Sequence, residues 1–179
     1  MRDAMDIPGV ILHRLKRHGD PRGVLVEIYR DDWVAPDRFR QWNLVRSEAN
    51  ALRGVHVHHG HYDYLHVIEG EMLLGLHDIR PDDPAERLSV FVTLSGTDPM
   101  AVEIPVGVCH GFWFPVRTTY VYGLSKPWSP AEKLGCRFDA PELGLDWPAS
   151  APILSADDSA PAYTYETMRA EWLAGPRGR

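Results

Sequence analysis

The fold is decided by the stretch YLHVIEGEMLLGLH, which runs from Tyr64 to His77. The two halves of this stretch are rich in β-branched, aromatic and large aliphatic residues, which favour β-strands. Glu69-Gly70-Glu71 separates the halves, and a glycine flanked by polar residues is typical of a tight turn. The stretch therefore predicts two strands joined by a tight reversal.

Segments of the same kind lie on both sides of this stretch, and turn residues separate them. The 15 glycines and 15 prolines divide the chain into pieces too short for most helices. One helix is predicted near the end, over Tyr165–Leu173, where apolar residues fall on one stripe. Many short strands at such spacing indicate an all-β sandwich or jelly roll with a short C-terminal helical segment. The predicted strands are Val24–Tyr29, Tyr64–Glu69, Glu71–His77, Leu88–Leu94, Ala101–Ile104 and Thr118–Leu124.

Length and composition limit the possible classes of protein. The 179 residues predict one domain over residues 1–179, with N-terminal strands to about 45, a core to about 125 and a C-terminal segment beyond. A formal charge of -6 argues against nucleic acid as a partner. The absence of a run of about 20 apolar residues argues against a membrane span. Two cysteines, expected to be reduced, suggest a cytoplasmic protein.

The histidines are concentrated in one short part of the chain. Five of the nine lie between His56 and His66, far more than an even distribution would place there. If the chain is extended from His56 to His58, these two side chains share a face. Two imidazoles on one face can ligate a metal, exchange protons or hold an anion. For His59 and His61, the sequence favours a solvated loop instead.

Two motifs around these histidines resemble those of the cupin superfamily. His56-x-His58, followed by Asp63 and Gly70, resembles the first cupin motif, and the Pro-x-Gly-x-x-His segment at 105–110 resembles the second. Three imidazoles and one carboxylate suit divalent iron, manganese, nickel or zinc. As an alternative to a metal-free site, the resemblance therefore implies a divalent metal ion held by His56, His58, Asp63 and His110.

Further motifs make a more specific resemblance. They are Asp20–Glu27, Gln41–Asn43, Leu52–His56, Ile104–Phe112, Tyr122–Glu132, Pro141–Pro148 and Ile153–Asp158. With these motifs, the chain from about Asp20 to Pro161 resembles the dTDP-4-dehydrorhamnose 3,5-epimerase family, whose fold is a cupin-type jelly roll. The resemblance implies an epimerase of a nucleotide-linked 4-keto-6-deoxyhexose in deoxysugar biosynthesis. It also implies a homodimer, in which N-terminal strands cross to the partner, and no cofactor.

The resemblance also implies a role for individual residues. Inversion beside a ketone needs a base, an acid and stabilisation of the enolate between them. By resemblance, His56 is the base, Asp158 orients it and Tyr122 is the acid. The residues that match substrate-binding positions, for the nucleotide diphosphate or the sugar, are Arg22, Glu27, Gln41, Asn43, Arg53 and His110.

One position departs from the family in a way that affects the chemistry. Where the family usually has a lysine near the sugar ketone, this sequence has Asp63. A carboxylate repels an enolate, so the stabilising donor would have to be Arg53, His58 or His110. Asp63 is also where metal-binding cupins place their acidic ligand. Two alternatives to the epimerase therefore stay open: a metal-dependent cupin isomerase or oxygenase, and a non-catalytic sugar-nucleotide binder.

Overall fold

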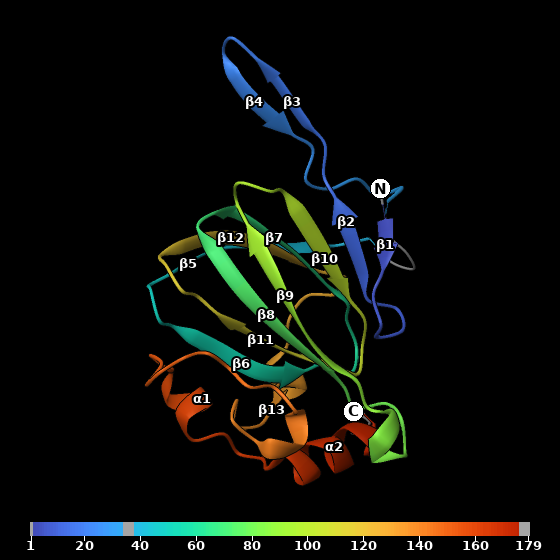
Figure 1. The fold of residues 1–179 in the computed structure, drawn as a ribbon. Coiled ribbons are helices and arrows are strands. Elements are labelled where there is room, and N and C mark those ends of the chain that lie inside the picture. The colour runs from blue at the N-terminus through green and yellow to red at the C-terminus, as the bar shows by residue number, and fades with distance from the viewer. Residues whose placement is uncertain (1, 34–37, 176–179) are drawn as a thin grey trace.

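The computed structural model describes residues 2–33 and 38–175, which form two antiparallel sheets and a separate hairpin (Figure 1). The first sheet has six strands in the order β1 (Arg2–Ala4), β2 (Ile11–Arg14), β10 (Met100–Ile104), β7 (Asp63–Glu69), β12 (Thr118–Leu124) and β5 (Gln41–Ser47). The second has five, in the order β13 (Leu134–Gly135), β6 (Leu52–Val57), β11 (Val108–Trp113), β8 (Glu71–Asp78) and β9 (Ser89–Ser95). The hairpin is β3 (Arg17–Asp20) with β4 (Gly23–Val26).

This architecture confirms the predicted all-β jelly-roll fold and most of its elements. The stretch from Tyr64 to His77 forms β7 and β8, and Gly70 makes the turn at a φ of 87°. The predicted C-terminal helix is α2 (Tyr165–Ala174), whose first turn is capped by the Thr164 side chain. Short helical turns complete the chain: η1 (Pro84–Glu86), η2 (Pro130–Glu132), η3 (Pro141–Leu143) and α1 (Ala156–Ser159).

One predicted strand, Val24–Tyr29, was wrong in its extent. Only Gly23–Val26 is a strand, and its pairing partner is β3 rather than either large sheet. The side chains of Val24 and Leu25 are 54% and 61% exposed. The apolar run Val24–Val26 is present, but among the described residues no further sheet packs over it. In Figure 1 this hairpin stands away from the body of the molecule.

Strand alternation decides which side chains enter the space between the sheets. On β6, Val55 and Val57 pack outward, against a core that includes Tyr165 and Met168 of α2. His56 lies between them and therefore points to the opposite face. On β7, Leu65 joins the main core and Tyr64 a separate cluster on the other face, so Asp63 points inward with Leu65. The same periodicity directs His110 of β11 and Tyr122 of β12 inward.

The C-terminal third of the chain covers the outer face of the five-stranded sheet (Figure 1). This position brings α1 beside β6. Asp158, the third residue of α1, is buried there and faces the strand that carries His56. Among the described residues, no helix is long and apolar enough to cross a membrane. The division of residues 1–179 into one domain stays a prediction, and residues 1, 34–37 and 176–179 lie outside the described part.

Candidate active site

A cavity of about 320 Å³ opens between the two sheets. Its wall combines apolar side chains of the strands with ionisable side chains from both sheets and from the C-terminal segment. The polar and ionisable residues that line it are Arg53, His56, His58, His61, Asp63, His110, Tyr120, Tyr122, Lys133, Ser155, Asp157 and Asp158. A concave pocket with convergent polar groups is the usual form of a small-molecule site.

One wall of the cavity carries a histidine–carboxylate pair. His56 Nε2 lies 2.9 Å from Asp158 Oδ1, and the Ser155 hydroxyl donates to the other carboxylate oxygen at 2.8 Å. Burial would raise the pKa of Asp158, but the hydrogen bonds from His56 and Ser155 outweigh it and lower the pKa. The carboxylate is therefore ionised and accepts the proton of His56 Nε2, which leaves Nδ1 as the basic nitrogen.

Tyr122 lines the same cavity from the opposite sheet. Burial and the nearby Asp63 carboxyl both raise the pKa of its phenol. Tyr122 therefore keeps its proton at neutral pH and is able to donate it. Tyr120, two residues earlier on β12, is more deeply buried, and that burial raises the pKa of its phenol.

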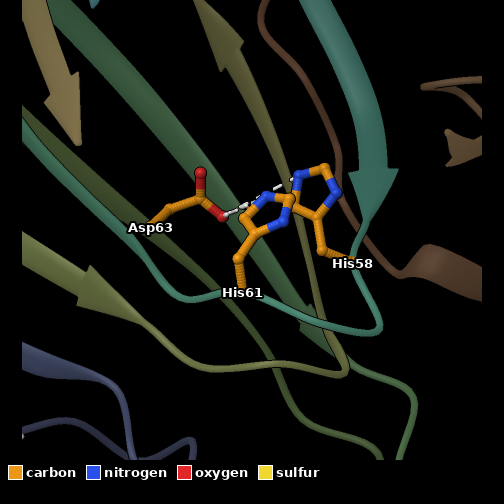
Figure 2. A group of neighbouring side chains, drawn as sticks. All are labelled: His58, His61 and Asp63. Atoms are coloured by element: carbon orange, nitrogen blue, oxygen red, sulfur yellow. Dashed lines mark ion pairs between the residues drawn. The ribbon is translucent and has the colours of Figure 1, made fainter. Parts of the chain in front are cut away.

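A second histidine–carboxylate group lies deeper in the cavity. Asp63 Oδ2 lies 3.8 Å from His58 Nε2, 4.0 Å from His61 Nε2 and 3.9 Å from His110 Nε2. The rings of His58 and His61 are stacked with centroids 4.0 Å apart, and Figure 2 shows both facing the Asp63 carboxylate. Burial lowers the pKa of His58 and His61 and brings that of His110 to about 3, so these imidazoles are neutral. Burial also raises the pKa of Asp63.

The structure brings only some of the predicted substrate-binding residues to the cavity. Arg53 and His110 line it, and the Arg53 guanidinium donates to the Ser47 hydroxyl at 3.0 Å. Gln41 and Asn43 lie on β5, and the Gln41 side-chain amide donates a hydrogen bond to Asn43 Oδ1. Gln41 also accepts a hydrogen bond from the backbone N–H of Trp128, a residue of the cavity wall.

Two predicted substrate-binding residues lie elsewhere. Arg22 sits in the turn of the β3–β4 hairpin, where it pairs with Asp20, and Glu27 follows β4. Neither lines the cavity of its own chain. In Figure 1 the hairpin projects away from the two sheets.

His61 corrects an expectation from the sequence. The sequence favoured a solvated loop for this residue, but His61 is 1% exposed and its Nδ1 lies 2.9 Å from Glu132 Oε2. His59 is half-buried, and its Nε2–H donates a hydrogen bond to the Trp172 carbonyl oxygen at 3.0 Å. Burial of His61 depends on Glu132, which is 71 positions away and carried no signal near the histidines.

Other cavity residues were also missed by sequence reasoning. Lys133 brings a cation to the wall, where it pairs with Asp157. Ser155 caps α1 and holds Asp158. The signal for Ser155 was present, because a serine followed by two acidic residues is typical of a helix start. Lys133 had no such signal.

Comparison with known proteins gives a consistent result. The model of the dTDP-4-dehydrorhamnose 3,5-epimerase family matches residues 4–164. A dTDP-4-dehydrorhamnose 3-epimerase of Streptomyces niveus is 31% identical over 86% of this chain and 79% of its own length. A dTDP-4-dehydrorhamnose 3,5-epimerase of Salmonella typhimurium is 30% identical over 86% of this chain and 90% of its own.

Solved structures show the same likeness. An epimerase of Mycobacterium tuberculosis superposes with a TM-score of 0.88 at 28% identity, covering 99% of this chain and 94% of that one. A 3,5-epimerase of Legionella pneumophila, solved with dTDP-4-keto-L-rhamnose, superposes with a TM-score of 0.86 at 27% identity over 100% and 98%.

The jelly roll, its cavity and these relatives define the class of this protein: it is an isomerase, a sugar-nucleotide epimerase, as the sequence predicted. Within that class, the chain belongs to the dTDP-4-dehydrorhamnose 3,5-epimerase family.

Proposed function

We propose that this protein epimerises a dTDP-linked 4-keto-6-deoxyhexose at a carbon next to the ketone, with His56 as base and Tyr122 as acid. The observation that carries the assignment is the 2.9 Å hydrogen bond between His56 and Asp158 on the wall of a cavity that Tyr122 also lines. The relatives that bind or act on dTDP-linked keto sugars support the substrate class.

The proton transfers use the protonation states described above. His56 Nδ1 removes the proton from the carbon alpha to the ketone, and the electron pair of that C–H bond forms the enolate. Asp158, held by Ser155, stabilises the imidazolium that results. Tyr122 then gives its phenolic proton to the opposite face of the same carbon. Both protons move between the sugar and side chains of this protein.

The substrate ends are held by different groups. Arg53 and Lys133 supply cations on the cavity wall, and an arginine fork suits a diphosphate. Asn43 lies directly across from Tyr122 in the strand register, with Gln41 two residues before it, so both are placed to contact the nucleotide or the sugar. His110 contacts the sugar region through its position in the inner wall.

We further propose that the active protein is a homodimer. The hairpin that carries Arg22 and Glu27 exposes Val24 and Leu25, and strand β5 exposes Leu44 at 61%. Exposed apolar side chains of this kind are typical of association surfaces. The hairpin of one subunit then reaches the cavity of the other, where Arg22 and Glu27 hold the substrate. A cytoplasmic location, expected from the reduced thiols, stays a prediction.

Deuterium exchange tests the proposal. The purified protein is incubated in D₂O with a dTDP-4-keto-6-deoxyhexose, and the sugar is followed by NMR. We expect deuterium at one or both carbons next to the ketone, and the count separates single-carbon from double epimerisation. Nucleotide-dependent thermal stabilisation without any exchange would instead identify a non-catalytic sugar-nucleotide binder.

A further inference from the structure

The hydrogen-bond partners of two buried histidines, His61 and His110, define which ring nitrogen carries the proton. His61 Nδ1 lies 2.9 Å from a carboxylate oxygen of Glu132, and His110 Nδ1 lies 3.2 Å from the Val108 carbonyl oxygen. Both partners are acceptors, so in each ring Nδ1 carries the proton. The Nε2 atoms of His61 and His110 therefore present lone pairs.

These lone pairs face a carboxylate across a gap. The Nε2 atoms of His61 and His110, and that of His58, lie 3.8–4.0 Å from Asp63 Oδ2, which is longer than a hydrogen bond. His61 Nε2 is buried and has no hydrogen-bond partner among the described residues. A buried acceptor left without a partner is destabilising, and here several acceptors converge on one point. A cation at that point would satisfy all of them.

We propose that His58, His61, Asp63 and His110 bind one divalent transition-metal ion. One donor atom from each of His58, His61 and Asp63 lies within 4.8 Å of the others. Bonds of about 2.0–2.1 Å in a tetrahedral site put donors about 3.3–3.4 Å apart. The Nε2 atoms of His58, His61 and His110 lie 3.8–4.0 Å from Asp63 Oδ2 and must move about half an ångström closer to it, and donors as far as 4.8 Å apart must close by up to about 1.4 Å. Neutral imidazoles and a carboxylate suit zinc, iron, cobalt, nickel or manganese.

The surroundings of the cluster match those of metal-binding histidines. Such histidines usually donate their second ring N–H to a carboxylate or a backbone carbonyl, which fixes the ring and increases its basicity. Here the Glu132 carboxylate accepts from His61 Nδ1–H, and the Val108 carbonyl accepts from His110 Nδ1–H. Asp63 is 6% exposed and His61 is 1% exposed, so water competes little for the donor atoms.

This ligand set differs from the set implied by the cupin resemblance. That resemblance placed His56 among the ligands, but His56 Nε2 is engaged with Asp158. His61 stacks on His58 and takes the fourth place. The base and the metal site therefore use different histidines of the same segment.

The ion also has a role that rests on the proposed function. Without an ion, the cluster supplies no positive charge for an enolate, because its imidazoles are neutral and an ionised Asp63 would repel one. A bound dication changes this to a net charge of one positive in the cavity that His56 and Tyr122 line. Such a charge stabilises the enolate oxygen, the task for which the family usually has a lysine.

Metal binding is testable without any activity assay. The purified protein is analysed for metal by elemental analysis, stripped with a chelator and titrated with Co²⁺, whose visible absorption reports coordination by nitrogen and oxygen. We expect one ion per chain in the wild type. The His61→Ala and Asp63→Asn variants should bind at least about 100-fold more weakly, and Glu132→Gln about 10–100-fold more weakly. His56→Asn and His59→Ala serve as matched controls and should bind as the wild type does.

Several results would overturn the site. They are a wild type that does not bind Co²⁺, equal binding by Asp63→Asn, and loss of binding in His56→Asn, which would favour the cupin ligand set. Asp63→Asn preserves side-chain volume, so it serves if His61→Ala does not fold. Bound metal without deuterium exchange would contradict the proposed function and support the metal site. Full exchange in a protein that binds no metal would keep the function and remove the site.

Discussion

Two carboxylates approach histidines in the same cavity, and the two groups differ in their spacing. Asp158 lies 2.9 Å from His56 Nε2, within hydrogen-bond distance, whereas Asp63 lies 3.8–4.0 Å from three ring nitrogens. The His56 side chain is 32% exposed, but Asp63 and His61 are almost fully buried. The same residue types therefore serve different chemistry: a proton-transfer pair needs contact and access, and an ion site needs a gap and exclusion of water.

The two groups also differ in how the carboxylate is supported. The Asp158 carboxylate accepts hydrogen bonds from the Ser155 hydroxyl and from His56, which keep it ionised. The backbone N–H of Asp158 in turn donates to Ser155 Oγ. Asp63 has a pKa raised by burial, and it faces the Nε2 atoms of His61 and His110, whose protons are on Nδ1. The Asp158 carboxylate finds its hydrogen-bond donors within the chain, whereas the Asp63 carboxylate needs a proton or a cation.

The largest expected effect comes from removing the base. His56→Asn should lower the rate of epimerisation by about 10²–10⁴-fold, because general base catalysis contributes on that scale. Its Co²⁺ affinity should stay unchanged, because His56 lies outside the ion site. The rate of deuterium incorporation and the Co²⁺ titration measure the two properties on one sample. Loss of both deuterium incorporation and Co²⁺ binding in this variant would show that the two histidine–carboxylate groups form a single site.

His77 shows that burial alone does not make a histidine available as a metal ligand. His77 is 2% exposed, but both of its ring nitrogens are hydrogen-bonded, at 2.8 Å, to the Ser89 and Tyr165 hydroxyls. Burial lowers the pKa of His77 to about 4, and the charges of Asp78 and Arg87 act in opposite directions. Because the folded pKa is below the unfolded value of about 6.5, the contribution of His77 to stability is complete above that pH.

That contribution should be lost as the pH falls from about 6.5 towards 4. The free energy of unfolding of the wild type should fall by roughly 2–3 kcal/mol more than that of His77→Gln over this range. Urea titrations at pH 7 and pH 4.5 measure the difference. Parallel pH curves for the two proteins would contradict the prediction. The wild type and His77→Gln should bind Co²⁺ with equal affinity at pH 7.

Substitution of Gly135, which lies beside His56, should disturb the His56–Asp158 pair and leave the ion site unchanged. A Cβ at Gly135 would lie 2.8 Å from His56 Cδ2 and 2.8 Å from the Val55 carbonyl oxygen. Gly135→Ala should displace the ring, destabilise the fold by about 1–3 kcal/mol and slow the reaction about 10–100-fold. Thermal unfolding and deuterium exchange measure the two effects.

The control for this variant is Gly19→Ala, because the nearest atoms to a Cβ at Gly19 are 3.9 Å away. It should change stability by less than about 0.5 kcal/mol. Equal effects of the two alanines would show that Gly135 does not position His56. Loss of Co²⁺ binding in Gly135→Ala would show that the base and the ion site are coupled.

The smallest expected signal tests whether the site is shared between subunits. Arg22→Ala and His56→Asn are each expected to be weakly active or inactive. If the hairpin of one subunit completes the cavity of the other, mixed dimers contain one intact site, and about a quarter of the wild-type activity should return on random exchange. Mixing followed by partial unfolding and refolding provides the exchange. Activity equal to the sum of the separate variants would place Arg22 and His56 in the same subunit's site.

Much of the fold was predictable because its signals are local. The β7–β8 pair follows from β-forming residues on both sides of Gly70, and α2 follows from a stripe of apolar residues. The strand over Val24–Tyr29 was overestimated, because its pattern does not reveal whether a covering sheet exists. The two exposed apolar residues of β4 have the sequence of a buried strand and the surroundings of a projecting hairpin.

The candidate site divides in the same way. The sequence by itself determined the family, the jelly roll and the histidines available to the cavity, because strand alternation and short motifs depend on neighbours in the chain. Tertiary structure alone decided which nitrogen meets which carboxylate. His56 is 102 positions from Asp158, and His61 is 71 positions from Glu132, yet those contacts determine which ring is a base and which presents a lone pair. Hydrogen bonds over such separations depend on how the sheets and the C-terminal segment pack, and no local pattern encodes that packing.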